Sequence, residues 1–201
     1  MRSSAKIAAA MLLLCLGAGE TQPAPVAVSI PVHAAQVVSG AVEQTLYTRL
    51  YDPAYVQLAY PGGDPPPDRG VCSDVVVRAF RRAGIDLQKE VHEDMARHFS
   101  SYPNPWHLRG PDPNIDHRRV ANLMTYFQRK GKSLPVTKTP EDYLPGDVVA
   151  WDLGNGQLHI GVVSDTRAPV RGYEIVHNIG AGARLEDVLF SWSIVGHYRY
   201  F

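Results

Sequence analysis

The sequence predicts an α+β protein in which N-terminal helices pack on a C-terminal antiparallel sheet of about four to six strands. Apolar residues recur at helical spacing through the first two thirds of the chain, and from Pro145 onward they alternate instead. Helices followed by strands is the order expected of an α+β fold. With 201 residues, 45% of them hydrophobic, the chain can bury one core, so we expect a single domain.

The first 19 residues are typical of a signal peptide. Arg2 and Lys6 supply positive charge, an apolar run covers 7–16, and small residues follow it. The run is too short to span a bilayer, and no later segment approaches the length of a transmembrane helix. We therefore expect an exported protein, periplasmic or extracellular.

Residues 20–35 are rich in proline and alanine and predict a linker, which leaves 36–201 as the folded domain. Cys15 raises the alternative of a lipid anchor. However, Leu14 stands where a lipoprotein signal needs a small residue, so we favour export without an anchor.

Four helices are expected along the first two thirds. Apolar residues repeat every four positions from 36 to 51, and helical spacing returns at 71–83, where Gly84 is a stop signal. Between these two helices, the glycines and prolines of 60–70 predict an irregular loop. The remaining helices are expected at 90–99 and at 116–131, with Asp116 as the N-cap, Ile115 packing on Val120 and Gly131 as the stop.

Four strands are expected in the last third, from the alternation that begins at Pro145-Gly146-Asp147. Asn155-Gly156 is a typical hairpin turn and joins the first two strands. The predicted strands cover 147–151, 159–164, 173–178 and 194–200.

Charge and cysteine content limit the function. Lys+Arg and Asp+Glu both number 20, so the chain lacks the basic excess that nucleic acid attracts, and we expect no nucleic-acid partner. Once a signal peptide is removed, Cys72 has no partner for an intramolecular disulfide. A lone thiol in an exported protein is either a buried, inert side chain or a reactive one.

Cys72 lies at the start of the predicted 71–83 helix. Free backbone N–H groups and the positive end of the helix dipole favour a thiolate there, and the same N–H groups can hold an oxyanion. The sequence therefore predicts Cys72 as a nucleophile with a lowered pKa.

Two histidines are candidates for the base. If the strands at 159–164 and 173–178 form a hairpin centred on Ala168, paired residue numbers sum to 336 and His159 lies opposite His177. Both rings then share one face of the sheet, so that one can act as base while the other orients it. The alternative is that both are ordinary strand residues with satisfied polar tips.

These segments together resemble the NlpC-type, papain-like cell-wall cysteine peptidases. The similarity lies in four motifs in the same order, over roughly 55–201: Gly70-Val-Cys-Ser-Asp74 opening a helix, Pro145-Gly-Asp, His159-Ile-Gly-Val-Val163 and Ile175-Val-His177. The resemblance implies a papain-like fold with Cys72 as nucleophile, His159 as base and His177 as third, orienting residue. It also implies an exported hydrolase of peptidoglycan that needs no cofactor or metal.

The resemblance extends to Tyr60, which matches a tyrosine lining the active site of that family, and to Ser73 beside the nucleophile. The alternative for Tyr60 is surface packing. Two positions depart from the family pattern, because Val71 stands where Asp is usual and Asp74 where Gly is usual. We expect Asp74 either to shape the pocket or to cap the helix.

An insert at 92–119 lies outside the peptidase pattern. Together with the ending Gly196-His-Tyr-Arg199, it resembles a family of exported bacterial proteins described only as a domain of unknown function. Within the insert, His117 and Arg118 could line a substrate cleft, although solvated positions at a helix start are the simpler expectation.

The favoured function is thiol-dependent hydrolysis of an amide bond, and an amidase or esterase acting on another acyl compound would use the same residues. A metal site built from Cys72, His159, His177 and His117 is a further alternative, although the chain has no closely spaced ligand pair. The last alternative is a non-catalytic protein of the cell envelope.

Overall fold

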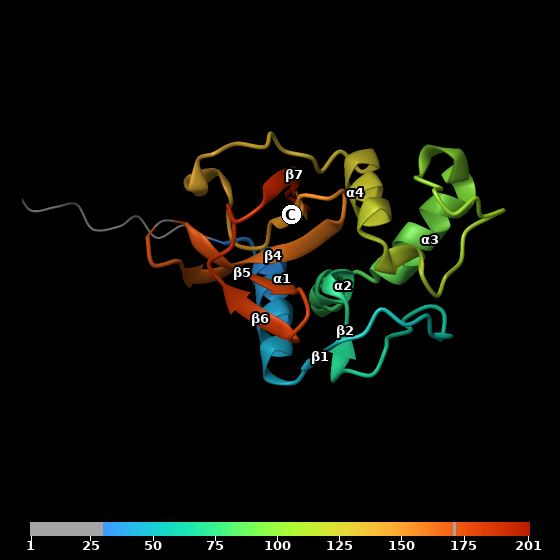
Figure 1. Ribbon diagram of the computed structural model, residues 1–201, viewed down its shortest axis with the longest axis horizontal. Coiled ribbons are helices and arrows are strands. Elements are labelled where there is room, and N and C mark those ends of the chain that lie inside the picture. The colour runs from blue at the N-terminus through green and yellow to red at the C-terminus, as the bar shows by residue number, and fades with distance from the viewer. Residues whose placement is uncertain (1–29, 171) are drawn as a thin grey trace, which may run out of the picture.

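The computed structural model describes residues 30–170 and 172–201, and it confirms the α+β class (Figure 1). The predicted signal peptide, Cys15 and residues 20–29 of the predicted linker lie outside the described residues. In the part of the chain that is described, no helix is long and apolar enough to cross a membrane. The α-helices are α1 (Val32–Glu43), α2 (Cys72–Arg82), α3 (Leu87–His98) and α4 (Val120–Arg129).

The sheet has five antiparallel strands in the order β6-β5-β4-β3-β7, and a short parallel pair, β1-β2, lies apart from it. Asn155 and Gly156 lie in the turn between β3 and β4, as predicted, and Gly156 takes a positive φ of 78°. The strand bounds are β1 (Leu50–Tyr51), β2 (Arg69–Gly70), β3 (Val148–Asp152), β4 (Leu158–Arg167), β5 (Tyr173–Asn178), β6 (Ala183–Glu186) and β7 (Ser193–Tyr198).

The helix predicted at 36–51 is shifted toward the N-terminus. α1 begins at Val32 and gives way to a 3₁₀ turn at Gln44–Leu46, after which 50–51 is extended. The four-residue repeat continues in the sequence, but Leu46 and Leu50 are exposed in the structure. Without core contacts, the end of the apolar stripe does not hold the helix together.

The predicted N-cap at Asp116 is wrong. Asp116 is fully buried and begins a 3₁₀ turn, and α4 starts only at Val120. Its carboxylate accepts from the backbone N–H of Asp112 at 2.7 Å and lies 3.1 Å from the ring of His92. The Asp116 carboxylate therefore bonds to the preceding turn and to His92 of α3 instead of capping α4. The predicted stop is confirmed, because Gly131 follows α4 with a positive φ of 66°.

The two faces of the sheet bury different clusters. Even-numbered residues of β3 and β4, such as Ala150 and Ile160, join the main core with the helices. Odd-numbered residues, such as Trp151 and Val163, form a second cluster on the opposite face. The side of β4 on which a residue lies therefore decides whether it faces α2.

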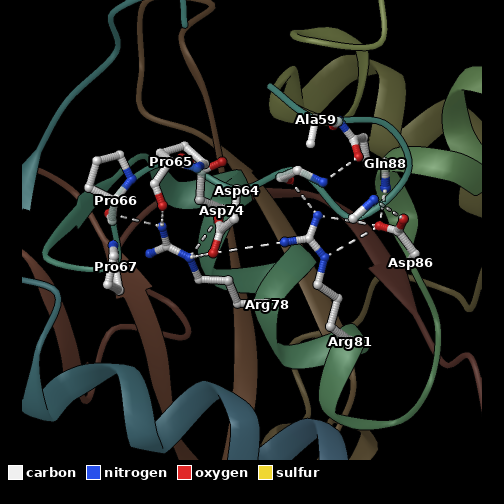
Figure 2. A network of polar contacts seen from close by, with 12 residues as sticks. Ala59, Asp64, Pro65, Pro66, Pro67, Asp74, Arg78, Arg81, Asp86 and Gln88 are labelled. Atoms are coloured by element: carbon white, nitrogen blue, oxygen red, sulfur yellow. Dashed lines mark hydrogen bonds and ion pairs between the residues drawn. The ribbon is translucent and has the colours of Figure 1, made fainter. Parts of the chain in front are cut away.

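The proline-rich loop predicted at 60–70 is irregular only as far as Asp68, because Arg69–Gly70 form β2, and it is firmly attached to α2 (Figure 2). Arg78 of α2 pairs with Asp64 at 2.9 Å and donates to three backbone carbonyls on the loop and β2. One turn further along, Arg81 donates to the carbonyl of Gly63 and to Asp86. These arginines tie the loop to the helix that begins with Cys72.

Candidate active site

Cys72 is the first residue of α2, as the sequence predicts. Val71 before it is extended, with φ −108° and ψ −179°, and its N–H donates to Oδ2 of Asp74 at 2.7 Å. An acidic side chain in the first turn also suits the positive end of the helix dipole. Asp74 therefore caps the helix, which is one of the two roles expected for it.

Asp74 is in turn held by Arg118, from the segment before α4. The Arg118 guanidinium donates to both carboxylate oxygens at 3.0 to 3.3 Å, and both side chains are 2% exposed. Arg118 also donates to the carbonyls of Asp52 and Ala54, and its own carbonyl accepts from the Ser73 hydroxyl at 2.7 Å. This cluster fixes the start of α2 and occupies the Ser73 hydroxyl in a structural bond.

The simpler expectation for His117 and Arg118, that both are solvated, is wrong. The 3₁₀ turn at Asp116–Arg118 directs both side chains inward, where the carboxylate of Asp74 compensates the buried guanidinium. Burial lowers the pKa of His117 to about 4, so its ring is neutral at neutral pH. Its Nδ1 has no partner among the described residues.

The thiol of Cys72 is buried, with 4% of the residue exposed. Burial raises its pKa from 9.0 to about 12, and the negative charge of Asp74 adds to the rise. The backbone N–H groups of Ile160, Ser73 and Cys72 act in the opposite direction, but burial dominates. The lowered pKa expected from the helix start is therefore not found, and the resting side chain is a neutral thiol.

A pocket of about 210 Å³ opens beside this thiol. Tyr51, Cys72, Arg118 and Leu158 contribute to its lining, and so do residues 115 and 120 from the segment leading into α4. The pocket has room for a small chemical group beside the sulfur. It brings the predicted insert into the site, because Ile115 and Arg118 both belong to 92–119.

The structure brings the two predicted histidines together. Nε2 of His159 lies 2.9 Å from Nδ1 of His177, with both side chains buried. Burial lowers the pKa of His159 to about 3, and His177 adds to that effect. Burial also lowers the pKa of His177, although the Glu186 carboxylate opposes the shift. Both rings are consequently neutral at neutral pH.

The predicted hairpin register is wrong by two residues. Val162 pairs with Val176 and Val163 with Ile175, so paired numbers sum to 338 rather than 336. The hairpin is asymmetric because the register shifts between Val163 and Arg167, a β-bulge the sequence did not reveal. A shift of two preserves the face, which is why His159 and His177 still meet, diagonally rather than directly.

The Cys72 thiol and the His159 side chain lie on opposite faces of β4. His159 pairs with Trp151 and shares its face, whereas Ile160 points into the helix-side core together with Cys72. The two residues are linked through the Ile160 N–H, which is directed at the sulfur. No hydrogen bond joins Cys72 to His159 within residues 30–170 and 172–201, and the Cys72 sulfur meets β4 at the backbone of Ile160, the residue after His159.

Two further residues surround the histidine pair, and the sequence analysis did not single them out. Nε2 of His177 lies 2.9 Å from Oε2 of Glu186 on β6, a strand that was not predicted. The ring of Trp192 lies edge-on to both imidazoles, at 5.8 Å from His159 and 6.0 Å from His177. The signal that could have indicated Glu186 is the short apolar-polar alternation of Ala183-Arg-Leu-Glu186, which ends at this residue.

Tyr60 does not line the Cys72 pocket. It lies partly exposed on the loop and packs edge-on against His92 of α3, at 5.2 Å between ring centroids. Tyr51 lines the pocket instead, and burial together with Cys72 raises the pKa of its hydroxyl. Tyr51 is therefore the aromatic residue that lines the pocket beside Cys72.

The proposed metal ligands do not converge. Within residues 30–170 and 172–201, no three His, Cys, Asp or Glu side chains are grouped so that they could hold a metal ion. His159, His177 and Glu186 form a linear chain of hydrogen bonds rather than a cage.

The fold and the site together define a class of protein. Its members are α+β proteins with a thiol at a helix start and a histidine pair on the adjoining strands. The sequence of this chain matches the model of a family described as Domain of unknown function (DUF1287) over residues 38–200. The chain belongs to this family, which confirms the predicted resemblance to a family of unknown function.

One relative in this class is the uncharacterized protein YijF of Escherichia coli strain K12. The two chains are 60% identical over 165 residues, which is 82% of this chain and 80% of YijF. Such identity over most of both chains supports the same fold for both.

Two solved structures show a limited similarity. NlpC1 from Trichomonas vaginalis has a TM-score of 0.46 at 13% identity, with 86% of this chain and 46% of that one covered. A protein from Staphylococcus aureus, described as similar to a lipoprotein of the NLP/P60 family, has a TM-score of 0.38 at 12% identity, with 81% and 41% covered. This chain thus spans less than half of either structure.

Proposed function

We propose that the protein is an exported thiol-dependent hydrolase that cleaves an amide bond, with peptidoglycan stem peptides as substrate. One observation carries the proposal. The Cys72 thiol, at a helix start, contacts the backbone of the residue that follows His159, and Nε2 of His159 is hydrogen-bonded to His177. Nδ1 of His159 makes no hydrogen bond with the described residues, so it is free to accept a proton. The peptidoglycan substrate rests on the motif resemblance and on the signal-peptide pattern.

The reaction starts from a neutral pair, because the thiol and the imidazole are both uncharged at rest. As sulfur attacks the carbonyl carbon, the thiol proton passes to Nδ1 of His159, and the carbonyl electrons move onto oxygen. Sulfur and Nδ1 must come within hydrogen-bond distance for this step. In the structure His159 lies on the face of β4 opposite the core that contains Cys72, so the Cys72 side chain must turn toward His159 when substrate binds.

The remaining steps use the same groups. The N–H groups of Cys72 and Ser73 open the helix and make no hydrogen bond with a described backbone acceptor, so they can stabilise the oxyanion. His159 then returns its proton to the leaving amine, which yields a thioester on Cys72. Water, deprotonated by His159, hydrolyses this acyl-enzyme and restores the thiol.

Digestion of purified peptidoglycan tests the proposal. We expect wild-type protein to release new fragments, detected by mass spectrometry, and Cys72→Ala to release none. We expect His159→Ala to lower the rate about 10²- to 10⁴-fold, the usual contribution of a general base. Thermal melting of each variant serves as the folding control. If wild type and Cys72→Ala give the same pattern, peptidoglycan is not a substrate of this thiol.

A further inference from the structure

We propose that Glu186 is a positioning residue that sets the tautomers of both histidines, so that the lone pair on His159 lies at Nδ1. This inference rests on the proposed function, because it concerns how His159 becomes a base. The chain of contacts is short: Oε2 of Glu186 is 2.9 Å from Nε2 of His177, and Nδ1 of His177 is 2.9 Å from Nε2 of His159.

The order of donors follows from what each group can do. A carboxylate only accepts hydrogen bonds, so Nε2 of His177 must carry the proton that faces Glu186. In a neutral imidazole the other nitrogen is then an acceptor, and Nδ1 of His177 accepts from Nε2–H of His159. His159 has its proton on Nε2, which leaves the lone pair at Nδ1.

Burial supports this order. Both rings are almost fully buried, and burial lowers the pKa of each, so at neutral pH each ring carries one proton rather than two. A doubly protonated His177 would donate toward His159 and reverse the tautomer. Glu186 is 39% exposed and therefore forms the end of the chain that meets solvent. Trp192 packs against both rings and limits their rotation.

The same arrangement of hydrogen-bond donors and acceptors is kept during the reaction. When His159 takes the thiol proton at Nδ1, its Nε2–H continues to donate to His177, and His177 continues to donate to Glu186. No hydrogen bond has to reverse, so the network loses nothing as the imidazolium forms. The carboxylate also stabilises that positive charge through His177.

Side-chain ¹⁵N NMR of histidine tests the assignment without reference to activity. In the wild-type protein at neutral pH, we expect Nε2 to give the protonated-type signal and Nδ1 the unprotonated-type signal for both His159 and His177. In Glu186→Ala, His177 loses its acceptor, so we expect both rings to give signals averaged between tautomers. Glu186→Gln keeps the shape of the side chain, but its amide can donate or accept, so we expect averaging there too.

Asp187→Asn is the matched control, because it removes a neighbouring exposed negative charge and should leave both sets of signals unchanged. If the wild-type tautomers persist in both Glu186 variants, the role of Glu186 is overturned. If the tautomers shift but no Cys72-dependent hydrolysis is found, the assignment of Glu186 stands and the proposed function fails. Where hydrolysis is present, we expect Glu186→Ala to slow it about a hundredfold.

Discussion

Cys72 in the native protein will react with iodoacetamide at pH 7 about fiftyfold more slowly than in the unfolded chain. Burial raises the pKa of the thiol from the usual 9.0 to about 12. The thiolate fraction then falls about 10³-fold, and the greater nucleophilicity of a more basic thiolate recovers only part of this loss. The limited access to the sulfur slows the reaction further.

The pH dependence of the alkylation rate shows the direction in which the pKa of Cys72 is shifted. Because the folded pKa lies above the unfolded one, the native rate should rise about tenfold per unit from pH 7 to beyond pH 10. The unfolded rate should level off near pH 9. Alkylation is to be followed on the peptide that contains Cys72, so that Cys15 does not contribute. A native rate at pH 6 that exceeds the unfolded rate would show an ion pair between thiolate and imidazolium instead of the neutral pair.

Removal of Arg118 will be the most destabilising change at the site. In Arg118→Ala, the Asp74 carboxylate is left buried without its cation, and unpaired buried charges of this kind cost about 3–5 kcal/mol. Asp74→Asn leaves the guanidinium of Arg118 unpaired and should cost a similar amount. Free energies of unfolding in urea measure both losses.

Two further variants separate the ion pair from other effects. The double variant Asp74→Asn/Arg118→Met removes both charges and should cost clearly less than the sum of the single changes, because neither charge is left alone. Arg69→Ala breaks an exposed pair with Asp68 and should leave stability almost unchanged. If the single variants at 74 and 118 are as stable as Arg69→Ala, the cluster does not hold the start of α2.

The sequence was sufficient to place the chemistry-bearing elements. The start of α2 at Cys72, the β3–β4 turn and the strands carrying His159 and His177 all follow from local signals such as periodicity and turn residues. The face shared by the two histidines also follows, because strand periodicity is unaffected by a shift of two residues.

What the sequence did not reveal depends on tertiary contacts. The buried pairing of Arg118 with Asp74 joins residues 44 positions apart, and no local pattern reports it. β6 alternates apolar and polar residues over only four positions, Ala183–Glu186, which is too short a pattern to identify a strand, and its pairing with β5 is what defines it. The pKa of Cys72 depends on burial by the surrounding core, which outweighs the helix dipole and the N–H groups visible from its position.

The most direct measurement of the central claim is the mass of the protein after rapid acid quenching during peptidoglycan digestion. Acid preserves a thioester, so peptide mapping can locate an acyl fragment of the substrate. We expect an adduct on Cys72 in the wild-type protein, and neither adduct nor product in Cys72→Ala. Product release by Cys72→Ala at the wild-type rate would contradict the claim that Cys72 is the nucleophile.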